Sequence, residues 1–237
     1  MKRSVLIISV LLNVFGAWAA IVTDDFNRPD TTYSTNGSAI GANWINCYTS
    51  TVSASSWEIH GNQLYAKCPT YVGQLVNTSL QTISGNGTNF ILRTDVSTES
   101  NRWIGVVFNY QDQNNYYHLR IKPGSKAYQL ISVKNTVLLP LMVTKMDATS
   151  PFNTNTFYTL TVTSSNAYNF GFTITQTGYT NVLNPTKTFV DTNSCFTAGY
   201  AGIFTGGATL KDPDMVFDNF YLYLTTPTIE PMVIKVK

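Results

Sequence analysis

The chain has 237 residues, of which only 12% are charged, with 15 basic and 13 acidic side chains. Lys2 and Arg3 belong to a predicted leader, which leaves 13 basic against 13 acidic residues in the mature chain. A neutral chain lacks the basic surface that binds nucleic acid or anionic lipid, so neither partner is expected. Its many Thr, Ser, Asn and Gln residues suit neutral, hydroxyl-rich ligands, and equally an ordinary extracellular β protein.

The first 19 residues have the pattern of a secretory signal peptide. Lys2 and Arg3 precede an apolar run over residues 5–15, and Ala17-Trp18-Ala19 forms an A-x-A site with cleavage before Ala20. The run is too short to span a membrane, so we expect a secreted, extracellular protein without membrane insertion. Residues 20–226 are then expected to form a single domain, followed by a C-terminal tail over residues 227–237.

After the leader, apolar and polar residues alternate, and turn residues recur about every ten positions. The alternation predicts strands at residues 22–26, 44–48, 57–60, 63–66, 73–76, 90–97, 103–110, 116–121, 128–133, 137–143, 157–164, 169–175, 186–191, 200–205 and 215–223. Many short strands and almost no helix indicate an all-β fold, an antiparallel β-sandwich or jelly roll.

Three cysteines, Cys47, Cys68 and Cys195, suit an oxidising compartment with one disulfide and one remaining thiol. Cys47 and Cys68 are close in sequence, which favours a disulfide between them, although Cys195 could replace either. No cysteine pair has the spacing of zinc ligands.

Three sequons begin at Asn36, Asn77 and Asn86. In a eukaryotic protein they would mark exposed loops that carry glycans. In a bacterial protein they would have no such meaning.

The stretch over residues 105–125 reads as a hairpin whose register can be predicted. A turn from Asp112 to Asn115 would pair Tyr110 with Tyr117, Phe108 with Leu119 and Val106 with Ile121 on the core side. The opposite face then carries a polar row, with the pairs Gln111–Tyr116, Asn109–His118 and Val107–Arg120. Because a slip of one residue would bury His118 and Arg120, this register is expected to hold both at the solvent face.

Several segments together resemble one superfamily. They are the opening DDFNRPD at residues 24–30, SSWEIHGNQLYA at 55–66, NRWIGVVFNYQDQNNYYHLRIKPGS at 101–125, and the closing GYAGIFT and MVFDNFYLY. The chain resembles the concanavalin A-like (laminin G-like, pentraxin-like) jelly-roll superfamily over nearly its whole mature length. The superfamily includes lectins, adhesion modules, glycoside hydrolases and polysaccharide lyases, so the resemblance implies contact with sugar without choosing a chemistry.

The favoured hypothesis is a lectin-like protein that binds polysaccharide or another glycan. Aromatic rings stack on the apolar faces of sugars, and amide side chains hydrogen-bond their hydroxyl groups. Trp103 and Tyr128 are the candidate stacking residues, and Asn109 and Gln111 the candidate hydrogen-bonding residues.

One alternative is a polysaccharide lyase that cleaves a uronate-containing polymer by β-elimination. Arg120 would neutralise the carboxylate, and His118 or Tyr116 would remove the adjacent proton. The chain lacks the alternating acidic strand of the related hydrolases, so hydrolysis is less expected than elimination. A further alternative is a non-catalytic structural or adhesion protein.

A calcium site is the last hypothesis. Asp25 lies on the predicted first strand and Asp218 and Asn219 on the last, and these strands are neighbours in jelly rolls. Their oxygen atoms could hold a structural Ca²⁺, as the resemblance also implies. Alternatively, Asp218 and Asn219 satisfy backbone groups at a strand end.

Overall fold

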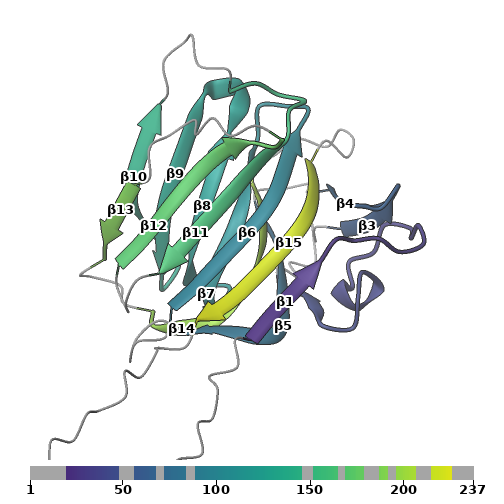
Figure 1. The fold of residues 1–237 in the computed structure, drawn as a ribbon, viewed down its shortest axis with the longest axis horizontal. Coiled ribbons are helices and arrows are strands. Elements are labelled where there is room, and N and C mark those ends of the chain that lie inside the picture. The colour runs from purple at the N-terminus through teal and green to yellow at the C-terminus, as the bar shows by residue number, and fades with distance from the viewer. Residues whose placement is uncertain are drawn as a thin grey trace, which may run out of the picture.

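The computed structural model describes residues 20–47, 56–67, 72–83, 89–145, 152–164, 169–178, 187–191, 196–206 and 215–225. Over these residues two antiparallel sheets pack face to face, which confirms the predicted all-β sandwich (Figure 1). The predicted leader and the tail over residues 227–237 lie outside the described residues. Within the described part, no helix is long and apolar enough to cross a membrane.

The larger sheet has eight strands in the order β13-β12-β11-β6-β15-β4-β3, and β1 pairs with β15 beside this path. These strands are β1 (Ala20–Asp24), β3 (Ser56–His60), β4 (Gln63–Lys67), β6 (Asn89–Thr98), β11 (Tyr158–Ser164), β12 (Asn169–Gln176), β13 (Lys187–Val190) and β15 (Met215–Thr225).

The seven-stranded sheet has the order β10-β9-β8-β7-β14-β5-β2. Its strands are β2 (Trp44–Asn46), β5 (Val72–Ile83), β7 (Trp103–Asp112), β8 (Asn115–Lys122), β9 (Ala127–Lys134), β10 (Val137–Lys145) and β14 (Ala198–Gly206). The part of the chain that the structure describes also contains two 3-10 turns, η1 (Gly37–Ala39) and η2 (Pro123–Ser125).

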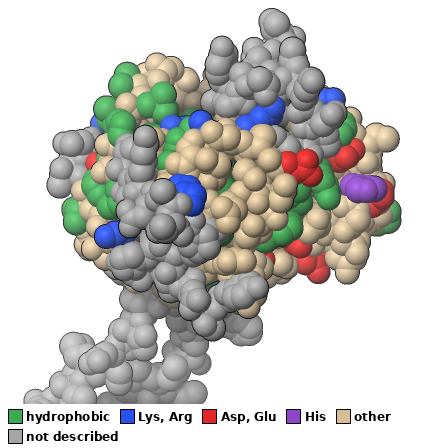
Figure 2. Space-filling model, turned by 90° about the horizontal axis from the view of Figure 1, so that it is seen from above, with side chains coloured by type: hydrophobic (Ala, Val, Ile, Leu, Met, Phe, Trp, Pro, Cys, Tyr) green, Lys and Arg blue, Asp and Glu red, His purple; other side chains and the backbone are tan. Residues whose placement is uncertain are grey.

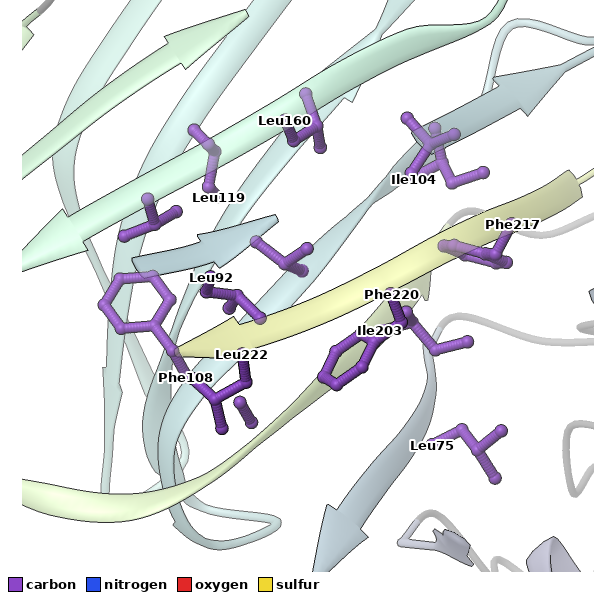
Figure 3. Close-up of a cluster of buried hydrophobic side chains, with 14 of the residues drawn as sticks. Leu75, Leu92, Ile104, Phe108, Leu119, Leu160, Ile203, Phe217, Phe220 and Leu222 are labelled. Atoms are coloured by element: carbon purple, nitrogen blue, oxygen red, sulfur yellow. The ribbon is translucent and has the colours of Figure 1, made fainter. Parts of the chain in front are cut away.

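The core lies between the sheets because every second side chain of a strand points inward. Figure 3 shows Leu92 and Leu160 of the eight-stranded sheet close to Phe108 and Leu119 of the seven-stranded sheet, and all four are fully buried. Burial of such side chains from both inner faces is the main force that holds a sandwich together.

A bulge in β7 changes the predicted hairpin register. Asp112 pairs with Asn115 as the predicted turn requires, but Phe108 pairs with Tyr117 and Val107 with His118. Three residues of β7 therefore lie opposite the single residue Tyr116, which makes the predicted partners wrong by two positions. Asn109 is at the bulge with a left-handed φ of 46°. Such bulges leave no periodic trace in a sequence.

The bulge also moves Tyr110 to the other face of the sheet. Its side chain packs with Tyr116 and Val107 in a second apolar cluster, instead of facing the core as predicted. Gly199 on the neighbouring strand accommodates the distortion, since a Cβ there would lie 2.3 Å from the carbonyl carbon of Asn109. The core-side prediction is confirmed for Val106, Phe108 and Leu119, because a two-residue shift preserves the alternation.

Hydrogen bonds to the Asp24 carboxylate hold the segment that follows β1 in place. Its Oδ1 accepts hydrogen bonds from the backbone N–H of Phe26 (2.8 Å) and from the Arg28 guanidinium, and Oδ2 accepts from the indole N–H of Trp44 (2.7 Å). Phe26 is fully buried at a left-handed φ of 53°, and its ring packs against Trp44. Arg28 also donates to the carbonyl of Ile40. One carboxylate thus joins β1, β2 and the loop between them.

The predicted disulfide between Cys47 and Cys68 is not formed, since Cys47 is a free cysteine. Its sulfur lies 3.4 Å from the carbonyl oxygen of Ile45, and burial raises the pKa of the thiol. Proximity in sequence was a poor guide, because Cys47 directly follows β2 of the seven-stranded sheet, whereas β4, which precedes Cys68 in the chain, belongs to the eight-stranded sheet. Cys68 and Cys195 themselves lie outside the described residues.

The sequon residues differ in their exposure. Asn36 is exposed and caps η1 through a hydrogen bond from the backbone N–H of Ser38. Asn77 is only 6% exposed in β5, so the prediction of an exposed loop is wrong at this sequon. Apolar alternation predicted a shorter strand there, whereas pairing with β14 extends β5 to Ile83. Asn86 lies outside the described residues.

Candidate functional site

The hairpin side chains predicted to face solvent are mostly buried. His118 points away from the core as predicted, but it is only 1% exposed, and its ring lies against Phe204 with a centroid separation of 4.4 Å. Neither ring nitrogen has a hydrogen-bond partner among the described residues, and burial, with a smaller contribution from Arg120, lowers the pKa of His118 well below 6.5. The predicted solvent exposure is wrong because Phe204 of β14 lies beside the imidazole, a contact that the hairpin sequence alone does not contain.

Three other predicted residues of this site are also buried. Asn109 is fully buried at the bulge, and its Nδ2 donates to the carbonyl of Phe196 (2.6 Å). Tyr128 is 3% exposed on the core side, where it packs against Phe172. Tyr116 is 5% exposed in the second apolar cluster. Their predicted contact with a ligand would therefore require the surrounding structure to open.

The remaining hairpin residues form a smaller surface group. Arg120 donates through Nε and Nη2 to Oε1 of Gln129, at 2.9 and 2.6 Å, and its guanidinium lies 4.5 Å from the ring centroid of half-buried Trp103. Burial lowers the pKa of Arg120 to about 10. Gln111 is exposed beyond the bulge. Trp103 and Gln111 are accessible, but the structure does not bring them together with Asn109 and Tyr128 into one site.

A pocket of about 910 Å³ lies instead on the outer face of the eight-stranded sheet. Its walls come from β1, β6, β11, β15 and the segment after β1. The lining residues are Thr23, Asp24, Asp25, Arg28, Ile91, Arg93, Asp95, Thr161, Asn219, Phe220 and Tyr221. Figure 1 shows these strands side by side in the front layer. They are far apart in the chain, so the pocket exists only in the folded protein.

One row of side chains crosses the floor of this pocket. Pairing places Thr23 opposite Tyr221, Tyr221 opposite Arg93, and Arg93 opposite Thr161. Arg93 is exposed, and among the described residues its guanidinium has no hydrogen-bond or ion-pair partner. The Tyr221 ring is half-buried and nearly parallel to that of Tyr223, with centroids 6.3 Å apart. The row therefore offers a ring face, a free guanidinium and hydroxyl groups to a ligand.

One end of the pocket is stiffened by a hydrogen-bonded group around Asp95. This carboxylate is 3% exposed and accepts from the hydroxyl of Thr159 (2.5 Å) and from Nδ2 of Asn219 (2.9 Å). Asn219 sits at a bulge of β15 with a left-handed φ of 50°. The bulge explains why Asp218 and Asn219, although adjacent in sequence, both avoid the core.

The residues predicted to hold calcium are neighbours, but the described residues do not form a metal site around them. Pairing of β1 with β15 brings Asp25 near Asp218, and burial, reinforced by the charges of Asp95 and Asp25, raises the pKa of Asp218. Both Asp95 oxygens already accept hydrogen bonds, and the Asn219 amide directs its nitrogen toward one of them. Within the described residues, no three His, Cys, Asp or Glu side chains are placed to hold a metal ion.

This arrangement gives the calcium hypothesis a direct test. We expect the melting temperature of the purified protein to be unchanged by millimolar CaCl₂ or by EDTA, because Asp95 and Asn219 are engaged with each other and too few carboxylates remain beside Asp25 and Asp218. Thermal unfolding measures this. A higher melting temperature with calcium that Asp218→Asn abolishes would contradict the expectation and restore the predicted site.

Two patterns in the sequence point weakly to this pocket: repeated threonines on one strand and repeated tyrosines on another. The outward positions of β11 carry Thr159, Thr161 and Thr163, and those of β15 include Tyr221 and Tyr223. A strand face made of one small polar residue type, or of two aromatic rings in succession, is a weak indication of a binding surface by itself. Its meaning depends on strand order, which the alternation does not reveal. Of the pocket residues, sequence analysis singled out only Asp25 and Asn219.

The described charged side chains of one face do not gather into a cluster (Figure 2). On the face shown in Figure 2, basic and acidic side chains form small separate groups among uncharged ones. This agrees with a chain in which 15 basic residues nearly balance 13 acidic ones.

Comparison with known proteins identifies the fold. No protein-family model and no curated protein sequence matches the chain. The carbohydrate-binding module CBM66 from Bacillus subtilis is similar in structure, with a TM-score of 0.56 and 14% identity over 75% of this chain and 93% of that chain. The CBM2 module of the evolved Dit of Lactobacillus casei BL23 phage J-1 gives a TM-score of 0.52 and 13% identity, over 86% of this chain and 95% of that chain. The exoplasmic/lumenal domain of VIP36 in its Ca²⁺/Man2-bound form gives 0.55 and 9%, over 90% of each chain.

These similarities show that the protein has the concanavalin A-like jelly-roll fold, as its sequence segments predicted. At such low identities they establish the fold alone. The function has to be argued from the residues of the pocket.

Proposed function

We propose that this protein is a secreted carbohydrate-binding protein that holds a neutral sugar in the pocket over β1, β15, β6 and β11. The observation that carries the proposal is the row Tyr221–Arg93–Thr161 on the pocket floor, in which the Arg93 guanidinium has no partner among the described residues. The carbohydrate-binding modules among the structural neighbours support the same reading. Secretion rests on the predicted signal peptide.

The chemistry of the row suits a sugar ring. Tyr221 presents an aromatic face to the apolar C–H face of the ring, and Arg93 presents several N–H donors in a fixed plane to adjacent hydroxyl groups. Thr23 and Thr161 add hydroxyl groups that both donate and accept. Asp24 and Asp95 are engaged with protein donors, so they shape the pocket and leave Asp25 as its accessible carboxylate.

The charges of the lining favour neutral over acidic sugars. Three aspartates and two arginines line the pocket, and one of these arginines is paired with Asp24. A uronate or sulfate group would therefore enter a pocket with a slight negative excess. The cost of unfavourable charge contacts makes neutral hexose or pentose polymers the expected ligands.

Replacing Tyr221 with Ala is expected to weaken binding roughly tenfold, because a stacked ring contributes on the order of 1 kcal/mol. Arg93→Ala removes charge-assisted hydrogen bonds and is expected to weaken binding by roughly 10- to 100-fold. A glycan array identifies the ligand, and isothermal titration calorimetry with that ligand measures the affinity of each variant.

Trp103→Ala is the matched control, since it removes an accessible aromatic residue from the other sheet. Its affinity should equal that of the unmodified protein. Loss of affinity in Trp103→Ala with normal affinity in Tyr221→Ala would refute the pocket and support the hairpin surface. Uniform absence of binding across the array would favour a structural or adhesion protein.

The lyase alternative needs an accessible base, and the buried His118 does not supply one. It is tested by the absorbance of unsaturated ends formed from uronate polymers. Product formation that His118→Ala abolishes would establish the lyase and show that the hairpin face opens.

A further inference from the structure

The row that crosses the pocket floor continues beyond the pocket. Thr161 of β11 pairs with Thr173 of β12, so five outward side chains stand in register on five adjacent strands. In order across the sheet they are Thr23, Tyr221, Arg93, Thr161 and Thr173. Four strand spacings give the row a length of roughly 19 Å, which exceeds the size of one sugar ring.

The outward positions beside the outer half of this row carry only threonine or glycine. The neighbouring outward positions on β11 are Thr159 and Thr163, and their partners on β12 are Thr175 and Gly171. All have short side chains or none, so no long side chain of these two strands blocks the path from the pocket. In Figure 1 no labelled strand crosses in front of β6, β11 and β12.

Threonine suits a surface that binds a chain of hydroxyl groups. Its hydroxyl both donates and accepts, and its methyl group can lie against a sugar C–H face. β-branching restricts χ1, so little rotamer freedom is lost when a ligand binds. Thr161 and Thr173 are half-buried at fixed strand positions, which leaves their orientation determined by the sheet.

We infer that the ligand of this protein is an extended, linear, β-linked polysaccharide, of which about four to five sugar units lie across the strands from β1 to β12. The inference rests on the proposed function and deepens it by naming the ligand class. An extended β-1,4-linked glycan repeats at a spacing close to that between paired strands. Successive sugar units therefore meet successive members of the row: the ring of Tyr221, the guanidinium of Arg93, then the hydroxyl groups of Thr161 and Thr173.

The test is the dependence of affinity on ligand length. Cello-, xylo- and manno-oligosaccharides of one to six units are titrated into the full chain by isothermal titration calorimetry. For at least one series, affinity is expected to rise with each unit up to four or five and then to level off. The Thr173→Val variant keeps the side-chain shape and removes the hydroxyl, and it is expected to bind the pentamer two- to tenfold more weakly with unchanged affinity for the dimer.

Thr188→Val is the control, because Thr188 lies on β13 opposite Gly171 and outside the row. It should bind every oligosaccharide with unchanged affinity. Affinity that stops rising at one or two units, while Tyr221→Ala still weakens binding roughly tenfold, would overturn the inference and leave the proposed pocket intact. Absence of binding in all three series would overturn the inference whatever the array shows. If the glycan array also showed no binding, the proposed function would be refuted together with the inference.

Discussion

Replacing Asp24 with Ala is expected to lower the free energy of unfolding by about 3 kcal/mol. The substitution leaves the indole N–H of Trp44, the backbone N–H of Phe26 and the Arg28 guanidinium without their common acceptor. Trp44 and Phe26 are buried, so water cannot replace the lost bonds without opening the core. Urea unfolding followed by tryptophan fluorescence measures the loss, and Trp44 itself should contribute to the signal.

Asp25 provides the control one residue away. It is exposed, and its side chain accepts one local hydrogen bond, from the backbone N–H of Asn27. Asp25→Ala should therefore change stability by less than about 1 kcal/mol. Equal destabilisation by the two substitutions would show that the segment is held by its backbone and not by the Asp24 carboxylate.

This network gives a structural role to the DDFNRPD segment, one of the segments that carry the resemblance to the jelly-roll superfamily. The first Asp binds three donors, the Phe fills the core at a left-handed φ, and the Arg completes the ion pair. Asp30 adds a hydrogen bond from the backbone N–H of Gly61. The segment thus stabilises the fold, and Asp25, the acidic residue predicted from sequence to be functional, lies outside the network.

The strands and the core face followed from period-two alternation, because burial between two sheets imposes that period on every strand. The predicted hairpin site failed for two reasons that alternation does not report. One is the bulge at Asn109, which adds residues without altering the pattern of neighbouring segments. The other is strand order: Phe204, which packs against His118, comes from β14 and is 86 residues away in the chain.

The pocket was missed for the same reason. Tyr221, Arg93 and Thr161 belong to three separate strands, and only the order β11-β6-β15 makes them neighbours. A single sequence contains each residue's outward orientation but not which strands are adjacent. Prediction of the fold class was therefore possible, whereas prediction of the site was not.

Acidification below pH 6.5 is expected to destabilise the fold through His118. The folded-state pKa of this imidazole is lowered, mainly by burial and then by Arg120, so the unfolded chain binds the proton more tightly. The stability is therefore complete above the unfolded pKa of about 6.5 and is lost as the pH falls from there toward the folded pKa. The slope is at most about 1.4 kcal/mol per pH unit, which limits the loss to about 2 kcal/mol by pH 5.

His118→Leu is expected to remove this loss without lowering stability at pH 7. The side chains that face the imidazole from the adjacent strands are Val107, Ile131 and Phe204, all apolar, so a leucine leaves no polar partner unsatisfied. Urea unfolding at pH 7, 6 and 5 measures the free energy of unfolding of the unmodified protein and of His118→Leu. The range stops at pH 5 because the raised pKa of Asp218 acts with the opposite sign, adding stability as the pH falls through it.

The control is the second histidine of the chain. His60 is exposed and forms its contact with Asp30 at 2.9 Å, so His60→Gln should retain the full loss between pH 7 and pH 5. A pH dependence that persists in His118→Leu and disappears in His60→Gln would assign the effect to the exposed pair. It would also mean that the imidazole of His118 is accessible to water. The hairpin face, which the sequence first indicated as a sugar-binding surface, would then be accessible as well.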